Sequence, residues 1–108
     1  MNCCEIMQGD QYDLLFVISV GDLQLTNDDV IDIEIVIGTL RKTKPAVTYD
    51  TNLCSWRFPI SQRDSFAMPV GEHKIQIRVL FPGGNVIGNP VGVLYVIPSD
   101  SQEVLNGV

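Results

Sequence analysis

The chain has 108 residues, 45% of them hydrophobic and 19% charged, which suits one globular domain and excludes an intrinsically disordered chain. Thirteen acidic residues against seven basic ones give a formal net charge of −6. This negative charge argues against binding to the phosphates of nucleic acids or to anionic membranes, so we expect neither as a partner.

Apolar residues that alternate with polar ones predict β-strands, because successive side chains of a strand point to opposite faces. The first part of the chain contains three such segments, residues 5–7, 12–20 and 30–37. The second is apolar on both faces over residues 14–20, which is typical of a strand covered on two sides or lying at a subunit contact. In the third, Asp32 and Glu34 alternate with four isoleucines that we expect to face the core: Ile31, Ile33, Ile35 and Ile37.

The central part of the chain predicts two strands and a helical turn. The strands are residues 47–49 and 53–60, and in the second we expect four side chains in the core: Cys54, Trp56, Phe58 and Ile60. Pro59 cannot donate to a strand ladder, so this strand should end at a sheet edge or outside the sheet. A helical turn should follow at residues 61–66, with Ser61 capping the amide of Asp64.

The last part of the chain predicts an antiparallel hairpin. Residues 72–81 alternate, with the even-numbered Lys74, Gln76 and Arg78 outward and four apolar residues inward: Ile75, Ile77, Val79 and Phe81. The four-residue turn 82–85 returns the chain into strands at 86–87 and 91–97. Between these two, Gly88-Asn89-Pro90 should mark a bulge or a switch between sheets. A second helical turn is expected within residues 99–105.

Seven or eight short strands with little helix predict an all-β fold, an immunoglobulin-like antiparallel β-sandwich over residues 1–97 followed by a tail, 98–108. A small barrel is the alternative. An antibody-type disulfide is not expected, because Cys54 precedes Trp56 by two residues and has no later partner.

The cysteines and the single histidine do not form a recognisable catalytic or metal site. Cys3, Cys4 and Cys54 are an odd number with an adjacent pair, a poor framework for disulfides, so we expect thiols. Together with His73 they would supply four zinc ligands, but adjacent cysteines do not reach one tetrahedral ion easily. We therefore expect no metal, no cofactor and no enzymatic activity, with His73 as an ordinary surface residue.

Two other groups of residues suggest binding sites with simpler explanations. Asp28, Asp29, Asp32 and Glu34 would suit a calcium ion, or would form a solvated face with Asp32 and Glu34 opposite Lys74 or Arg78. The sequence leaves open whether the Asp28-Asp29 turn binds a cation. A carbohydrate site would need exposed aromatic residues, and the available ones are dispersed: Tyr12, Tyr49 and Tyr95.

The N-terminal region shows no targeting segment. The apolar run 14–20 is shorter than the about 20 residues that cross a bilayer. Acidic residues precede it where a signal peptide has basic ones, at Glu5, Asp10 and Asp13. We expect neither a signal peptide nor a membrane segment.

Three stretches carry a resemblance to a known family. They are residues 9–20 (GDQYDLLFVISV), 25–38 (LTNDDVIDIEIVIG) and 56–88, which begins WRFPISQRDSF and ends IQIRVLFPGGNVIG after Pro69 and Gly71. Together they resemble small immunoglobulin-like proteins of tailed bacteriophages and prophages, including the N-terminal domains of upper baseplate proteins. The resemblance implies a mechanical role for the matching residues. Gly71 and Gly83-Gly84 would set turns, and four residues would fill the core: Trp56, Phe58, Ile75 and Ile77.

The function expected from this resemblance is structural. The chain would be a non-enzymatic component of a phage particle, in the tail, the baseplate or a head–tail accessory, made in the bacterial host cytoplasm and located in the virion. Its partners would be other virion proteins and further copies of itself in a homo-oligomer. The residues expected at an oligomer contact are Leu14, Phe16, Ile18, Val104, Leu105 and Val108. The alternative is a carbohydrate- or surface-binding β-sandwich module.

Overall fold

The computed structural model describes residues 4–105 and confirms the all-β class, with 52% of residues in strands and 9% in helices. The first five strands are β1 (Cys4–Met7), β2 (Tyr12–Phe16), β3 (Ser19–Val20), β4 (Leu23–Gln24) and β5 (Asp32–Ile37). The other five are β6 (Leu40–Thr43), β7 (Thr48–Asp50), β8 (Ser55–Ile60), β9 (Gly71–Leu80) and β10 (Val86–Ile97). The helices are a 3-10 turn, η1 (Asn27–Asp29), and α1 (Gln62–Ala67).

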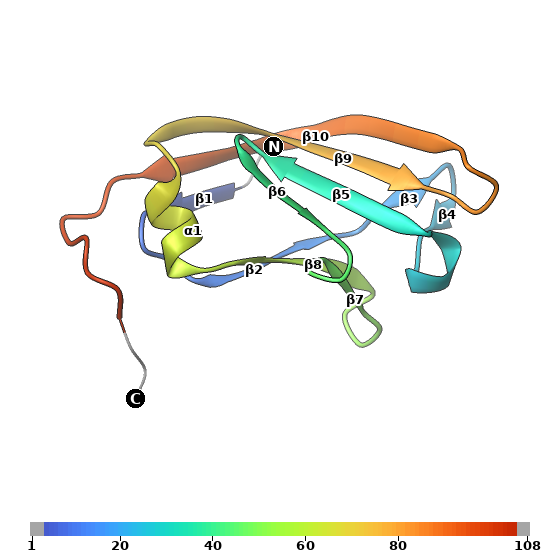
Figure 1. Ribbon diagram of the computed structural model, residues 1–108, viewed down its shortest axis with the longest axis horizontal. Helices are drawn as coiled ribbons and strands as arrows, with labels where there is room; N and C mark the ends of the chain where they lie inside the picture. Colours follow the sequence, from blue (N-terminus) through green and yellow to red (C-terminus); the bar gives the residue numbers. More distant parts are fainter. Residues whose placement is uncertain (1–3, 106–108) are drawn as a thin grey trace.

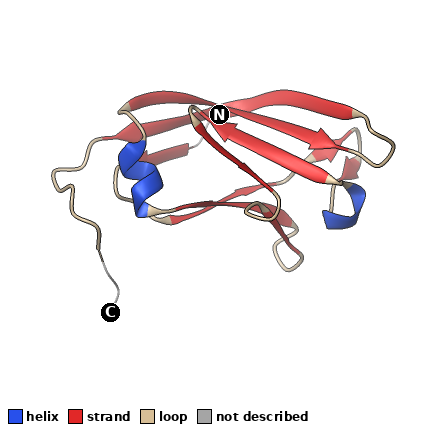
Figure 2. Cartoon of the chain, viewed as in Figure 1, coloured by secondary structure: helices blue, strands red, loops and turns tan. Residues whose placement is uncertain are grey.

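The strands form two layers with the core between them (Figure 1). A five-stranded sheet has the order β1-β10-β9-β5-β6, and a three-stranded sheet has the order β2-β8-β7. The short β3–β4 hairpin forms a separate two-stranded sheet. The two helices lie at opposite ends of this sandwich (Figure 2), α1 near the C-terminal tail and η1 near the β3–β4 hairpin.

The pairing differs from the prediction at one edge of the larger sheet. All other pairs are antiparallel, but β1 runs parallel to β10, from Cys4 beside Leu94 to Met7 beside Ile97. Residues 4–105 contain ten strands rather than seven or eight. The predicted strand 12–20 is divided into β2 and β3, and two short strands were not expected: β4 and β6.

The core contains the aromatic and aliphatic side chains that the alternation predicts. Trp56 and Phe58 are fully buried, and the indole Nε1 of Trp56 donates a hydrogen bond to the carbonyl oxygen of Leu25 at 3.1 Å. The five-stranded sheet contributes six buried residues from β5 and β9: Ile33, Ile35, Ile37, Ile75, Ile77 and Val79. Phe81 is half-buried and packs against this cluster.

Two side chains predicted to lie in the core are exposed instead. Ile31 is 55% exposed, because it precedes β5 and lies outside that strand's alternation. Cys54 is an exposed, free thiol, because it lies in the turn before β8, with a φ of +51° that takes it out of the strand's extended conformation.

The predicted turns and caps are largely confirmed. Ser61 caps α1, its hydroxyl accepting a hydrogen bond from the amide of Asp64 at 3.0 Å. The β9–β10 hairpin turns at Pro82-Gly83, where the amide of Gly84 donates to the carbonyl of Phe81 at 3.0 Å and Gly83 has a φ of +100°. The expected bulge lies between Pro90 and Gly92, within a continuous β10. The expected helical turn in residues 99–105 is wrong: these residues contain neither helix nor strand.

Candidate interaction surface

An open apolar groove of about 540 Å³ lies near the tip of the β9–β10 hairpin, at the end of the sandwich away from α1. One wall is the segment that leaves β2, residues 15–21, with Leu25. The other wall consists of alternate residues around the end of β9 and of residues of β10: Ile77, Val79, Phe81, Ile87, Gly88, Asn89 and Val91. None of the lining residues is charged and most are apolar, so the groove suits an uncharged partner surface.

The groove exists because the two sheets do not overlap over their full length. β2 stays paired with β8 only as far as Phe16, which lies opposite Trp56. Beyond this point the chain leaves β8 and forms the β3–β4 hairpin. The three-stranded sheet therefore ends before it reaches the tip of the β9–β10 hairpin. Ile87 is therefore 48% exposed, although it lies directly opposite the buried Val79 in the pairing of β9 with β10.

The predicted oligomer-contact residues of the first apolar run are divided between core and groove. Leu14 is part of the core, opposite Phe58 in the sheet register. Phe16 and Ile18 are half-buried, pack against the core and line the groove. The strongly exposed side chain of this run is Val17, at 65%.

Sequence reasoning did not single out other exposed apolar residues around the groove. They are 44–49% exposed: Leu15, Val20, Ile87 and Val91. Leu15 and Val20 belong to the run 14–20, which is apolar on both faces and so indicates apolar residues outside the core. Alternation alone does not show which of the two faces packs on the core.

The described part of the tail, which contains the predicted contact residues Val104 and Leu105, lies at the opposite end of the molecule from the groove (Figure 1). Val104 is 47% exposed and Leu105 is 79% exposed, whereas Val108 lies outside the described residues. The side-chain amide of Gln62, in α1, bonds both backbone groups of Leu105, accepting from its N–H at 2.7 Å and donating to its carbonyl at 2.6 Å. This contact holds the tail beside α1.

Three of the four acidic residues considered for calcium are engaged in local contacts: Asp29, Asp32 and Glu34. Asp29 accepts a hydrogen bond from the Thr26 amide at 2.8 Å, and Asp32 accepts one from the Ile33 amide at 2.8 Å. Glu34 lies opposite Arg78 in the sheet, as expected, and their side chains pair at 2.6 Å.

A second arginine completes the environment of Glu34. Arg41, on the neighbouring strand β6, also pairs with this carboxylate. The hydrogen bonds from Arg78 and Arg41 lower the pKa of Glu34 to about 2. Across residues 4–105, no three or more His, Cys, Asp and Glu side chains are grouped to hold a metal ion.

The histidine and the described cysteine side chain are not brought together. His73, in β9, has its Nε2 2.6 Å from the carbonyl oxygen of Pro69. Cys54, in the turn before β8, has its Sγ 3.6 Å from the carbonyl oxygen of Thr51. The side chains of Cys3 and Cys4, the other members of the considered zinc set, lie outside the described part of the structure.

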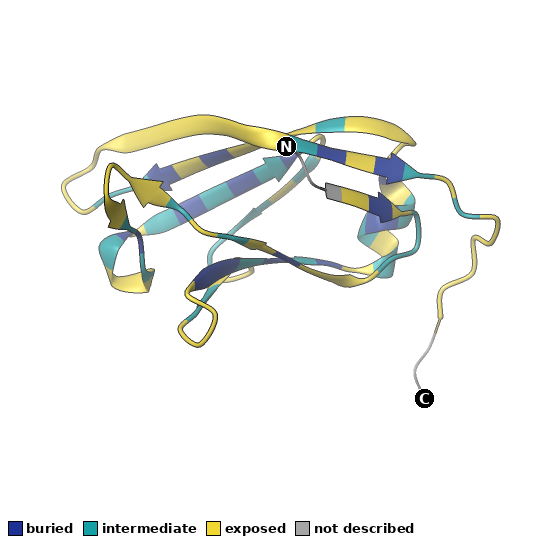
Figure 3. Cartoon of the chain, turned by 180° about the vertical axis from the view of Figure 1, so that it is seen from behind, coloured by how far each residue is buried: buried dark blue, intermediate teal, exposed yellow. Residues whose placement is uncertain are grey.

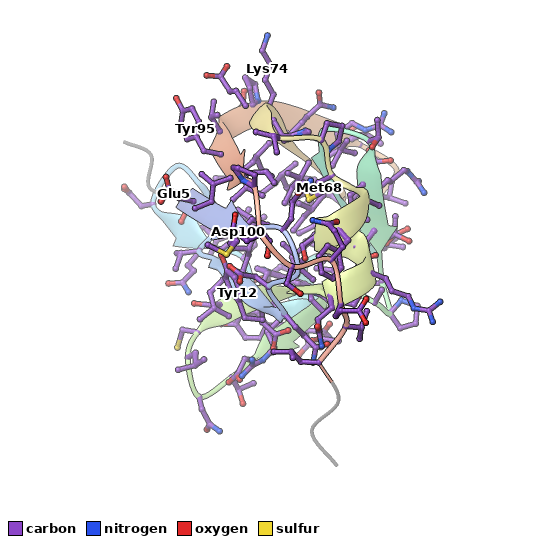
Figure 4. All side chains as sticks on the ribbon, turned by 90° about the vertical axis from the view of Figure 1, so that its left-hand side faces the viewer. Glu5, Tyr12, Met68, Lys74, Tyr95 and Asp100 are labelled. Atoms are coloured by element: carbon purple, nitrogen blue, oxygen red, sulfur yellow. The ribbon has the colours of Figure 1, made fainter. Side chains whose placement is uncertain are left out.

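The three tyrosines do not share one surface. Tyr49 packs edge-on against Trp56, with 5.3 Å between ring centroids. Tyr95 is 45% exposed and points away from the five-stranded sheet, whereas Tyr12 is 39% exposed and belongs to the three-stranded sheet (Figure 4). A carbohydrate platform would need such rings side by side.

No family model matches the sequence, and neither a curated protein nor a solved structure shows significant similarity to it. Within residues 4–105, no helix has the length and apolar character required to cross a membrane.

Proposed function

We propose that this chain is a non-enzymatic structural or assembly protein that acts through protein–protein contacts. The observation that carries the proposal is the uncharged groove with exposed apolar residues around it, among them Val17, Ile87 and Val91. Exposed apolar side chains gathered around a groove commonly mark a protein interface. The partners proposed are other virion proteins and further copies of the chain.

The assignment to a tailed phage or prophage particle rests on the sequence resemblance, in the tail, the baseplate or a head–tail accessory. The positions of several residues that carry the resemblance support this assignment. Gly71 and Gly83 have positive φ values of +126° and +100°, and Trp56 and Phe58 fill the core between two sheets. We propose that the chain is an immunoglobulin-like sandwich, synthesised in the host cytoplasm and located in the virion.

The test is detection of the chain in particles. Particles from a host that carries the gene are purified on a density gradient and analysed by mass spectrometry, with a particle-free fraction of the same lysate as control. We expect peptides of this chain to be enriched with the known particle proteins. Absence from intact particles, together with specific binding to a glycan array, would instead support the carbohydrate- or surface-binding module.

A further inference from the structure

The hydrogen bonds of β9 show to which side of the strand each residue directs its backbone N–H and C=O. The carbonyl of Leu80 accepts from the amide of Ile31 at 2.8 Å, and the carbonyl of Lys74 accepts from the amide of Gly38 at 3.1 Å. The even-numbered residues of β9 therefore direct their N–H and C=O groups towards β5. Because these directions alternate along a strand, the odd-numbered residues of β9 bond to β10.

This alternation leaves part of β10 with outward backbone groups. Val86 and Gly88 lie opposite even-numbered residues of β9, and so does Pro90. Their backbone N–H and C=O groups therefore point away from β9, towards the other edge of β10. Val86 and Gly88 each present an N–H and a C=O there, whereas Pro90 presents only a C=O because proline has no amide hydrogen.

No strand in residues 4–105 covers these groups. β1 pairs with β10 only along Leu94–Ile97, so among the described residues no strand pairs with residues 86–93 on that side. Residues 86–92 are exposed throughout, as the long exposed stretch of β10 shows in Figure 3. An uncovered strand edge of this kind is a template for pairing with another strand.

The edge is complementary to itself in one register. In an antiparallel pair with a two-fold axis at Ile87, Val86 lies opposite Gly88 of a second copy, and Gly88 lies opposite the second copy's Val86. Each residue offers one donor and one acceptor, so both pairs are fully hydrogen-bonded. Pro90 lies just outside this ladder, where its missing N–H costs nothing.

The side chains favour the same register. The axis places Ile87 directly opposite its counterpart, on the face that lines the groove, and an apolar pair at such a position stabilises strand pairing. Residues 86–91 carry no charge, so the net charge of −6 produces no direct repulsion at the contact. A register displaced towards Pro90 would bring a residue without a donor into the ladder.

We infer that the edge of β10 joins two copies of this chain in a two-fold dimer centred on Ile87. The dimer merges the two five-stranded sheets and covers part of each groove. This inference rests on the proposed function in that it names one of the partners of the same surface.

The test uses a single cysteine at the axis. In a C3S/C4S/C54S background, Ile87→Cys places two thiols across a non-hydrogen-bonded pair, where the Cα atoms of facing residues are about 4.5 Å apart, within the range of a disulfide. We expect mild oxidation to give a covalent dimer on a non-reducing gel. Val86→Cys is the matched control: the two Val86 positions are offset along the strands, beyond the about 7 Å limit, so it should stay monomeric.

A second measurement follows the uncrosslinked protein. Ile87→Lys places two ammonium groups against each other at the axis, so light scattering of the full chain should change from dimer to monomer, with an unchanged circular dichroism spectrum. A chain that is monomeric at about 1 mM, or equal crosslinking of the two cysteine variants, overturns the inference. If the chain is detected in particles but Ile87→Cys does not crosslink, the dimer is rejected and the proposed function is retained. If Ile87→Cys crosslinks but the chain is absent from particles, the dimer is retained and the proposed function is rejected.

Discussion

Trp56 and Leu25 are joined inside the core by a hydrogen bond of 3.1 Å, from the indole Nε1 to the backbone carbonyl. Both residues are buried, and Leu25 also lines the groove. The indole thus ties the three-stranded sheet to the segment that forms one groove wall.

Replacing Trp56 with Phe should lower the free energy of unfolding by about 2–3 kcal/mol, because the smaller ring leaves a cavity and the Leu25 carbonyl loses its donor. Urea unfolding followed by circular dichroism measures the change. Tyr49→Phe keeps the ring that packs against Trp56 and should change stability by no more than about 0.5 kcal/mol. Equal losses for the two variants would contradict the role assigned to the indole.

Alternation along the sequence predicts the faces of β5, β8 and β9 because each of these strands has one core side and one polar side. It therefore gives Ile33 and Ile77 as core residues and places Glu34 near Arg78. The same reasoning is wrong at Ile31, which precedes β5, because the local pattern does not show at which residue a strand begins.

The groove and the free edge could not be predicted in this way. Residues 14–20 are apolar on both faces, so the alternation of side chains does not indicate which face packs on the core. The end of pairing with β8 at Phe16 depends on tertiary packing, which a local pattern does not show. The free edge depends on the direction of the backbone N–H and C=O groups of Val86 and Gly88. The pattern of side chains along the sequence carries no information about that direction. The parallel pairing of β1 with β10 joins the two ends of the chain, which local signals do not connect.

Ser65 should be important for joining α1 to the N-terminal turn. Its side chain is fully buried, accepts a hydrogen bond from the Gly9 amide at 2.8 Å and donates to the Asp10 carbonyl at 2.8 Å. Ser65→Ala leaves these two backbone groups unpaired, so stability should fall by about 1–3 kcal/mol in urea unfolding. Ser101→Ala, in the exposed tail, should change it by no more than about 0.5 kcal/mol. A loss for Ser65→Ala that is also no more than about 0.5 kcal/mol would show that the buried hydroxyl is not needed.

Glu34 should make stability depend on acid. The arginines lower its pKa to about 2 in the folded chain, against an ordinary value of 4.5. Its contribution to stability is therefore complete above about pH 4.5 and is lost as the pH falls towards about 2. Glu34→Gln removes this contribution, so the variant should be less stable at neutral pH and should lose less stability between pH 4.5 and 2 than the original chain.

Unfolding free energies at several pH values over this range measure the effect. Asp50, whose pKa is also lowered by Arg57, remains in the variant, so part of the acid sensitivity should persist. An identical dependence on pH in the variant and the original chain would refute the prediction for Glu34.

Deleting residues 98–108 should weaken assembly and spare the fold. In the described part of the tail, Leu105 is bound to α1 through Gln62, while the core lies entirely before residue 98. The unfolding free energy should change by no more than about 0.5 kcal/mol, and light scattering should show smaller assemblies. A full-length Val104→Ser/Leu105→Ser variant separates loss of apolar groups from loss of chain length. If truncated and full chains are both monomers, docking of the tail onto a neighbour is ruled out.

Gly38 should be intolerant of any side chain for two separable reasons. Its φ of +61° disfavours residues with a Cβ, and a Cβ built there would lie 2.4 Å from Nδ1 of His73. Gly21 has a nearly identical φ of +60° but open space around it, so Gly21→Ala measures the backbone strain alone, about 1 kcal/mol.

Gly38→Ala should cost more than Gly21→Ala, about 2–4 kcal/mol, because the imidazole must move and give up its contact with the Pro69 carbonyl. Combining Gly38→Ala with His73→Ala removes the clash, so the cost of the glycine substitution in that background should fall to the value for Gly21→Ala. Thermal and urea unfolding of the four variants supply the comparison. A cost that is the same with and without the imidazole would show that backbone strain alone explains the glycine.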